Sequence, residues 1–341
     1  MPKTALLSRF PHTRLIEGPT PVQRLDRLES VLGARAKDIT IWAKRDDLMG
    51  LGGGGNKLRK LEFLMGQAAA EGCDTLVAIG GVQSNFARLA AAACARSGLA
   101  CELVLAQMVP RDMAIYQENG NVLLDRLFGA RLHILAKGDD AGGFATRRAS
   151  EMAATGRKVF VATLGGSTPV GCLGYVDCAV EIAMQSAELG VEFDQIVIPN
   201  GSGGMHAGLA AGMVVAGRDP SRIVAHTVLS PVDTCIATTV DKVNAVLQLM
   251  SREEQVGPPD LRISGGQLGG GYGIPTQEMV ETVRLVGRSE GLLLDPVYGG
   301  KAFAGLLRDI EIGTIAPGSN VLFVMTGGSP GLYAYADALD N

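Results

Sequence analysis

The stretch that most constrains this chain reads Gly52-Gly53-Gly54-Gly55-Asn56-Lys57-Leu58-Arg59-Lys60-Leu61-Glu62-Phe63. Glycine adopts positive φ without steric cost and lets a backbone approach a ligand closely. After it, Leu58, Leu61, Leu64 and Met65 have the spacing of a helix with one buried face. The pattern therefore predicts a flexible loop that delivers Lys57 onto the start of a helix, with its amine in a cleft.

Two other interpretations of this loop need weighing. A nucleotide-binding P-loop has Gly before its lysine and Ser or Thr after it, whereas Asn56 and Leu58 stand here, so that motif is excluded. A solvated lysine after a surface loop fits the stretch taken alone, because loops are generally polar and exposed. Other parts of the sequence must decide whether Lys57 is reactive.

Length and composition bound the kinds of protein this can be. With 341 residues the chain is long enough for about two domains. Its net charge of -4 is mild and dispersed, which argues against a nucleic-acid partner. No run approaches the ~18 apolar residues of a membrane span, and residues 1–10 lack a leader pattern, so we expect a cytoplasmic protein.

The six cysteines point to a reducing compartment. They form no CxxC pair and most have apolar neighbours, so we expect small core residues and no metal site. They are Cys73, Cys94, Cys101, Cys172, Cys178 and Cys235.

Short apolar runs alternate with helical stretches, which is typical of parallel sheets covered by helices on both faces. We therefore expect an α/β protein with two packed domains, open twisted sheets and the site between the domains. The predicted strands are residues 75–79, 100–105, 131–135, 159–163, 195–199, 223–229 and 320–325.

Glycine clusters follow several of these strands, where open parallel sheets bind their ligands. The loop Gly201-Ser202-Gly203-Gly204, with Met205 and His206 after it, lies between a strand and an apolar helix over 207–215. Backbone N–H groups and the positive end of a helix dipole favour an anion there, so we expect a phosphate site. A purely structural turn is the alternative. The glycine spacing does not match a dinucleotide fingerprint.

Four further polar residues lie in Gly-rich turns. Ser84 and Asn85 open a helix after Gly80-Gly81, where Ser84 is also a natural N-cap. Tyr272 and Tyr298 stand in Gly- and Pro-bounded loops, and each is a proton-handling candidate or a packed anchor. Motifs of serine hydrolases and zinc enzymes are absent from the sequence.

Taken in order, these sites resemble the pyridoxal 5′-phosphate (PLP) enzymes of fold type II, which are tryptophan synthase β-like. Within them the chain is similar to the 1-aminocyclopropane-1-carboxylate (ACC) deaminase and D-cysteine desulfhydrase group over nearly its whole length. The matching motifs are Arg9-Phe10-Pro11, Gly18-Pro19-Thr20-Pro21, Lys44-Arg45-Asp46-Asp47, 54–63, 79–85, Asp295-Pro296-Val297-Tyr298 and Thr326-Gly327-Gly328.

The resemblance implies a role for each candidate. Lys57 would hold PLP as a Schiff base and then move the Cα proton, while Ser84 would contact the substrate. Tyr272 and Tyr298 match active-site tyrosines. The residues implied to bind the cofactor are Lys57, Asn85 at its 3′-oxygen, Gly201, Ser202, Gly203, Gly204 and Met205 at its phosphate, and Thr326 beside its ring nitrogen. Residues 1–57 and 169–341 would form the large PLP-binding domain and 58–168 an inserted small α/β domain, in a homodimer acting on a small amino acid.

Departures from the group bear on the substrate. The deaminases have a glutamate at Gly299 and a leucine at Thr326, so ring-opening deamination is disfavoured. Thr326 agrees with the desulfhydrases, which differ from this chain at Gly299, Phe86 and Leu89. A wider pocket favours β-elimination of sulfite from L-cysteate, with D-cysteine desulfhydration as the alternative. A dehydratase or racemase activity, or a binding protein without catalysis, is the remaining alternative.

Overall fold

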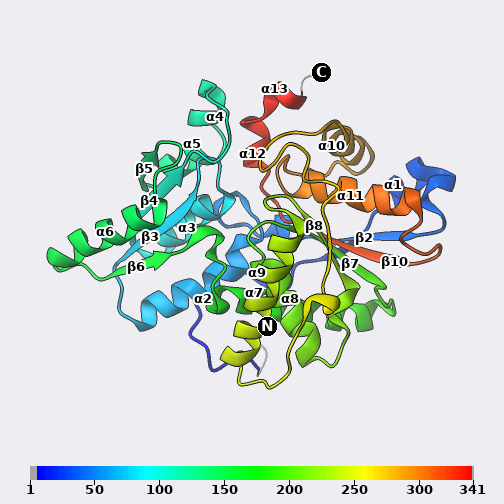
Figure 1. Cartoon of the computed structure of the whole chain (residues 1–341), viewed down its shortest axis with the longest axis horizontal. Helices are drawn as coiled ribbons and strands as arrows, with labels where there is room; N and C mark the ends of the chain where they lie inside the picture. Colours follow the sequence, from blue (N-terminus) through cyan, green and yellow to red (C-terminus); the bar gives the residue numbers. More distant parts are fainter. Residues whose placement is uncertain (1–5, 340–341) are drawn as a thin grey trace.

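The computed structural model describes residues 6–339 and contains two sheets covered by helices (Figure 1). Residues 1–5, on which part of the leader expectation rests, lie outside the described residues. One sheet has the strand order β1-β2-β10-β7-β8-β9, parallel except for the antiparallel pair β1 and β2. Its strands are β1 (Val22–Arg24), β2 (Thr40–Lys44), β7 (Gln195–Asn200), β8 (Ile223–Thr227), β9 (Arg262–Ser264) and β10 (Asn320–Val324).

The second sheet has four parallel strands in the order β5-β4-β3-β6. Its strands are β3 (Thr75–Gly81), β4 (Ala100–Ala106), β5 (Arg131–Leu135) and β6 (Val159–Ala162). All four lie inside the segment 58–168, which we propose as the small domain. The two sheets give the mixed α/β architecture that the alternating pattern predicts.

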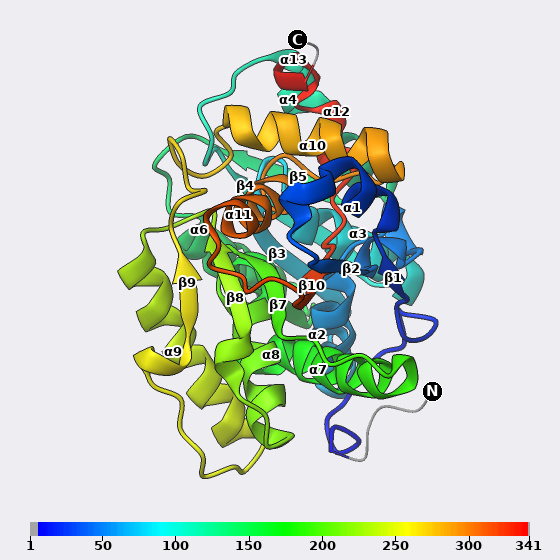
Figure 2. The same ribbon diagram turned by 90° about the vertical axis from the view of Figure 1, so that its right-hand side faces the viewer.

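Helices cover both faces of the larger sheet because its strands are apolar on both sides (Figure 2). Ile196 and Ile198 of β7 pack toward one group of helices, while Val197 between them packs toward the other. The first group is α7 (Pro169–Leu189), α8 (Gly204–Val215) and α9 (Val232–Leu249). The second group is α1 (Asp26–Leu32), α10 (Gln277–Glu290) and α11 (Gly299–Ile312).

The smaller sheet is covered in the same way. Leu76 and Leu103 pack with α2 (Lys57–Ala70) and α3 (Asn85–Ser97), whereas Val77 and Val104 pack against α6 (Ala141–Ala154). The short helices are α4 (Ala114–Glu118), α5 (Asn121–Leu127), α12 (Pro330–Tyr333) and α13 (Ala336–Leu339).

All seven predicted runs are strands, with ends shifted by two residues at most. In the described part of the chain three further strands were not predicted: β1, β2 and β9. β1 and β9 lie at the sheet edges and have three residues each. Three residues are too few to show the alternation of apolar and polar side chains that predicts a strand. β2 ends in Lys44, a charged residue that is nonetheless fully buried.

Two observations concern the kind of protein. Across residues 6–339 no helix is long and apolar enough to cross a membrane. Five of the six cysteines are buried and Cys73 is partly exposed, in line with small core residues.

Candidate active site

The glycine clusters at the strand ends come together around two adjoining cavities. The glycine-loop cavity is lined by Asn56, Lys57, Lys60, Asn85, Pro199, Asn200, Gly201, Ser202, Gly203, Gly204, Met205, His206, Tyr298 and Thr326. The tyrosine cavity is lined by Lys57, Gly81, Ser84, Asn85, Phe86, Met108, Leu164, Gly165, Ser202, Leu229, Tyr272 and Tyr298. Every site residue predicted from the sequence lines at least one of them. Lys57, Asn85, Ser202 and Tyr298 line both.

Lys57 begins α2 at the point where the two cavities meet. The glycines before it, Gly52 to Gly55, all have positive φ, between 62° and 127°, which other residues adopt only with strain. Burial lowers the pKa of the Lys57 amine to about 8, against the opposing attraction of Asp295. With this pKa, about a tenth of the amine is neutral and nucleophilic at pH 7.

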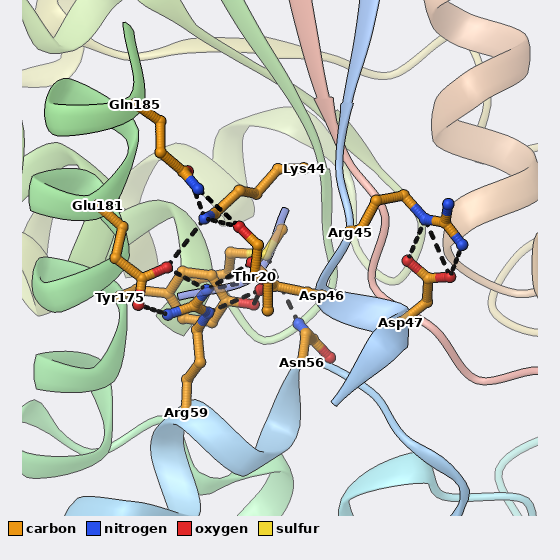
Figure 3. Close-up of polar contacts among 11 residues, drawn as sticks. Thr20, Lys44, Arg45, Asp46, Asp47, Asn56, Arg59, Tyr175, Glu181 and Gln185 are labelled. Carbon is orange, nitrogen blue, oxygen red and sulfur yellow. Dashed lines mark hydrogen bonds and ion pairs between the residues drawn. The ribbon is translucent and has the colours of Figure 1, made fainter. Parts of the chain in front are cut away.

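A buried network of opposite charges fixes the helix that carries Lys57 (Figure 3). Arg59 donates from Nε and Nη2 to both carboxylate oxygens of Asp46, at 2.8 Å each, and from Nη1 and Nη2 to Glu181 at 3.0 and 2.8 Å. Lys44 donates to Glu181 at 2.9 Å. Two cations thus balance two carboxylates, and the first turn of α2 is tied to β2 and α7.

The glycine loop forms a cradle suited to an anion. Gly203, with φ 78°, leads directly into the N-terminus of α8. Lys60 Nζ donates to Ser167 Oγ at 2.8 Å, and the Oγ atoms of Ser167 and Ser202 lie 2.6 Å apart. A Cβ atom at Gly204 would come within 2.7 Å of Lys60 Nζ, so only glycine permits this approach. A cation, two hydroxyls and a helix N-terminus therefore converge on one point.

Lys60 was not among the residues predicted for the site. Burial, together with the nearby charge of Lys57, lowers the pKa of the Lys60 ammonium to about 7. Its position three residues after Lys57 was the available signal, because residues i and i+3 share one helix face. Ser167 carried no comparable signal, since it comes from a turn more than 100 residues away.

Three buried polar atoms of the glycine-loop cavity have no hydrogen-bond partner among residues 6–339. They are Thr326 Oγ1, Asn200 Oδ1 and His206 Nε2. Burial lowers the pKa of His206 to about 4, so its ring is neutral at physiological pH. Buried polar atoms normally have partners, so three unpartnered atoms on residues that line one cavity fit a polar ligand there.

The start of α3 serves two purposes. Ser84 Oγ accepts a hydrogen bond from the Ala87 amide at 3.1 Å, which is the structural capping role expected of it. Ser84 also lines the tyrosine cavity. Asn85 Oδ1 accepts from Asn121 Nδ2 at 3.1 Å, which orients the Asn85 side chain toward both cavities.

The two tyrosines form a hydrogen-bonded pair at the other side of Lys57. Their hydroxyl oxygens lie 2.7 Å apart, and Lys57 Nζ lies 5.7 Å from the centre of the Tyr298 ring. Burial raises the pKa of both phenols, so both are protonated at neutral pH. Asp295 accepts from the Tyr298 amide at 3.1 Å and from the Gly299 amide at 2.7 Å, and this holds the turn that carries Tyr298.

The Tyr272 loop depends on a buried lysine that sequence reasoning missed. Lys301 Nζ donates to the carbonyl oxygens of Leu268 at 2.8 Å and Gly271 at 3.0 Å. Lys301 belongs to α11, which begins directly after Tyr298. One ammonium group therefore joins the segments that carry both tyrosines.

The three residues linked to substrate choice occupy different places. Phe86 lines the tyrosine cavity. Leu89 lines neither cavity, and its side chain packs instead against Gly52 and Gly55. Gly299 also lies outside both cavities, and a Cβ atom at this position would lie 3.1 Å from Asp295 Oδ1. Of the three positions, only Phe86 borders the space in which a substrate would react.

Comparisons with known proteins agree with this geometry. A family model described as pyridoxal-phosphate dependent enzyme matches residues 13–327. The chain is 40% identical over 345 residues to a 1-aminocyclopropane-1-carboxylate deaminase of Burkholderia ambifaria (strain MC40-6), covering 98% of this chain and 99% of the relative. It is 38% identical over 340 residues to the protein of that name from Methylobacterium sp. (strain 4-46), covering 98% and 100%.

A solved structure described as an ACC deaminase homologue superimposes with a TM-score of 0.87. The sequence identity is 36%, over 99% of this chain and 98% of that chain. Fold, cavities and relatives thus lead to one assignment: the chain belongs to the pyridoxal-phosphate-dependent enzymes of fold type II, in the ACC deaminase family, and its cofactor is pyridoxal phosphate.

Proposed function

We propose that this enzyme is a lyase that eliminates a sulfur substituent from Cβ of a small cysteine-like amino acid and gives pyruvate and ammonia. The observation that carries the proposal is the half-buried Lys57 side chain, whose amine has a pKa of about 8, between an anion cradle and a pair of protonated tyrosines.

The residues present fit PLP. Gly201 to Gly204 and Met205, together with Lys60, Ser167 and Ser202, would hold its phosphate. Asn85 would bind its 3′-oxygen, and the unpartnered Thr326 hydroxyl would meet its ring nitrogen. The bound cofactor supplies an electron sink for negative charge that develops at the substrate Cα.

The chain's own groups would then move the protons. Lys57 would carry the cofactor and, once released by the incoming amino acid, take the Cα proton as a neutral amine. Ser84 and the N-terminus of α3 would bind the substrate carboxylate. The Tyr272 and Tyr298 pair would supply a proton near Cβ as the carbon–sulfur bond breaks. Hydrolysis of the released aminoacrylate yields pyruvate and ammonia.

ACC deamination, the activity in the names of the relatives, is the main competitor. It is disfavoured by Gly299 and Thr326, which replace the glutamate and leucine of the deaminases. Among the described residues, no carboxylate side chain lines either cavity. Production of 2-oxobutyrate from ACC at a rate above that of any sulfur substrate would reverse this order.

Two sulfur substrates remain. The sequence favoured L-cysteate, on the expectation of a wider pocket. D-cysteine is the second candidate, and one observation favours it: Lys57 is the sole charged side chain among the described residues lining the tyrosine cavity. A sulfonate would have no guanidinium partner there, whereas Phe86, Met108, Leu164 and Leu229 suit a neutral thiol.

The decisive assay incubates purified enzyme with L-cysteate, D-cysteine and ACC and measures pyruvate, sulfite, sulfide and 2-oxobutyrate. Sulfite with pyruvate identifies the sulfo-lyase, and sulfide with pyruvate identifies the desulfhydrase. Absence of pyruvate from both substrates contradicts the proposal. Assembly as a homodimer stays a prediction, tested by light scattering.

A further inference from the structure

Arg88 lies outside both cavities yet contacts the loop that positions Lys57. It belongs to α3 and is fully buried. Its Nη1 donates to the Gly52 carbonyl and its Nη2 to the Gly54 carbonyl, at 2.9 Å each. A Cβ atom at Gly53 would come within 3.1 Å of Nη1, so glycine is required for the guanidinium to lie against the backbone. The loop and the arginine are thus fitted to each other.

The loop has little else to define its shape. Its backbone bonds are Gly54 N to Leu51 O at 3.0 Å, Asn56 N to Thr326 O at 3.0 Å and Leu58 N to Gly55 O at 3.2 Å. Four successive glycines with positive φ lose more conformational entropy on ordering than other residues would. A planar, fixed fork of donors can hold two carbonyls at a set spacing, which a lysine ammonium cannot do.

The loop carbonyls are the groups that hold the Arg88 guanidinium. Burial lowers the pKa of Arg88 to about 10, opposed by attraction to Asp125 and Asp295. Asp125 of α5 is itself fully buried, and burial raises its pKa to about 8, so its carboxyl group is largely neutral at pH 7. The hydrogen bonds to Gly52 and Gly54 are therefore the main compensation for burying this cation.

We propose that Arg88 is a positioning residue that couples the Lys57 loop to the start of α3. Arg88 lies one helical turn after Ser84 and Asn85. The Lys57 amine and the groups of α3 that would contact cofactor and substrate are therefore held at a fixed spacing. This inference rests on the proposed role of Lys57.

The test uses the holoenzyme and three variants: Arg88→Met, Arg88→Lys and, as the matched control, Arg96→Met at the exposed end of α3. Hydrogen–deuterium exchange is followed in peptides covering residues 50–57. We expect exchange in Arg88→Met to be faster by about tenfold or more, with a smaller effect in Arg88→Lys and none in Arg96→Met. The pH midpoint of the cofactor's visible band should shift in the same order, and kcat should fall more than KM rises.

Wild-type exchange and an unshifted midpoint in Arg88→Met would overturn the inference. Should Arg88→Met fail to fold, wild-type behaviour of Arg88→Lys would overturn the inference equally. Failure of the proposed role of Lys57 is distinguished by another measurement. Borohydride reduction followed by peptide mapping would then place the cofactor on a different lysine. The exchange experiment would still report whether Arg88 orders the loop.

Discussion

The hydroxyl oxygens of Tyr272 and Tyr298 lie 2.7 Å apart, although the two residues come from separate loops. One hydroxyl donates and the other accepts, which leaves one proton of the pair for a third group. Both loops are fixed from behind, Tyr298 through Asp295 and Tyr272 through Lys301. The geometry of the pair is therefore set by its surroundings before a substrate arrives.

Replacing either tyrosine with phenylalanine should lower kcat by about 100-fold, a size typical of a positioned proton donor. Because the hydroxyls act as one unit, the double variant should be little slower than the worse single variant. Steady-state kinetics measure this, with the cofactor's visible band as the control for intact binding. If the reductions in kcat of the two single variants multiply in the double variant, the two hydroxyls act independently.

Covalent attachment of PLP to cofactor-free enzyme should depend on pH through Lys57. The neutral amine attacks the PLP aldehyde, so with a pKa of about 8 the rate should rise with pH below 8 and level off above it. An ordinary lysine would level off near pH 10.4. Stopped-flow absorbance follows the reaction, and Lys57→Ala should show no covalent band. A plateau above pH 10 would contradict the effect of burial on this amine.

Lys60→Met should weaken binding of PLP by about tenfold or more, because it removes a cation from the anion cradle. Pyridoxal, which lacks the phosphate, should bind the variant and the wild type with similar affinity. Lys158→Met, at an exposed lysine, is the matched control and should change neither affinity. Equal losses for PLP and pyridoxal would mean that Lys60 acts on the ring or on the fold, not on the phosphate.

Lys301→Met should loosen the Tyr272 loop, since two carbonyls lose their donor. We expect a loss of about 1–3 kcal/mol in the free energy of unfolding, together with a lower kcat. Lys37→Met is the matched control, because Lys37 also donates to a backbone carbonyl, at Glu311, but on the surface. Its effect should stay within about 0.5 kcal/mol. Urea unfolding measures the free energy of unfolding of both variants. Equal losses would show that the Lys301 hydrogen bonds stabilise the protein no more than the surface hydrogen bond of Lys37.

The different placement of Phe86 and Leu89 predicts different outcomes of substitution. Phe86→His should change the ratio of kcat/KM for D-cysteine and L-cysteate, because position 86 borders the tyrosine cavity. Leu89→Gln should leave that ratio unchanged and cost about 1–3 kcal/mol of stability, since it buries an amide among apolar neighbours. A shift of the ratio in Leu89→Gln alone would show that the loop at Gly52 and Gly55 governs substrate choice.

Much of the fold was readable because its signals are local. Runs of five to seven residues rich in apolar side chains predicted seven strands, and β2 escaped because its apolar run, Ile41 to Ala43, has only three residues. The site residues were readable for a related reason: within each sheet the parallel strands end at one edge, where ligands bind. Ser84, Ser202 and Thr326 follow such strand ends, and all three border the cavities.

By itself, then, the sequence determined seven of the ten strands in the described residues, the turns at their ends and the lysine between the cavities. The tertiary structure decided which buried charges support that lysine. Arg59 finds Glu181 more than 120 residues away, Arg88 reaches Gly52 and Lys301 reaches Leu268. It also decided that Phe86 borders the cavity and Leu89 does not. Such contacts depend on side-chain directions across packed elements, and a buried charge is tolerated only where folding brings it a partner.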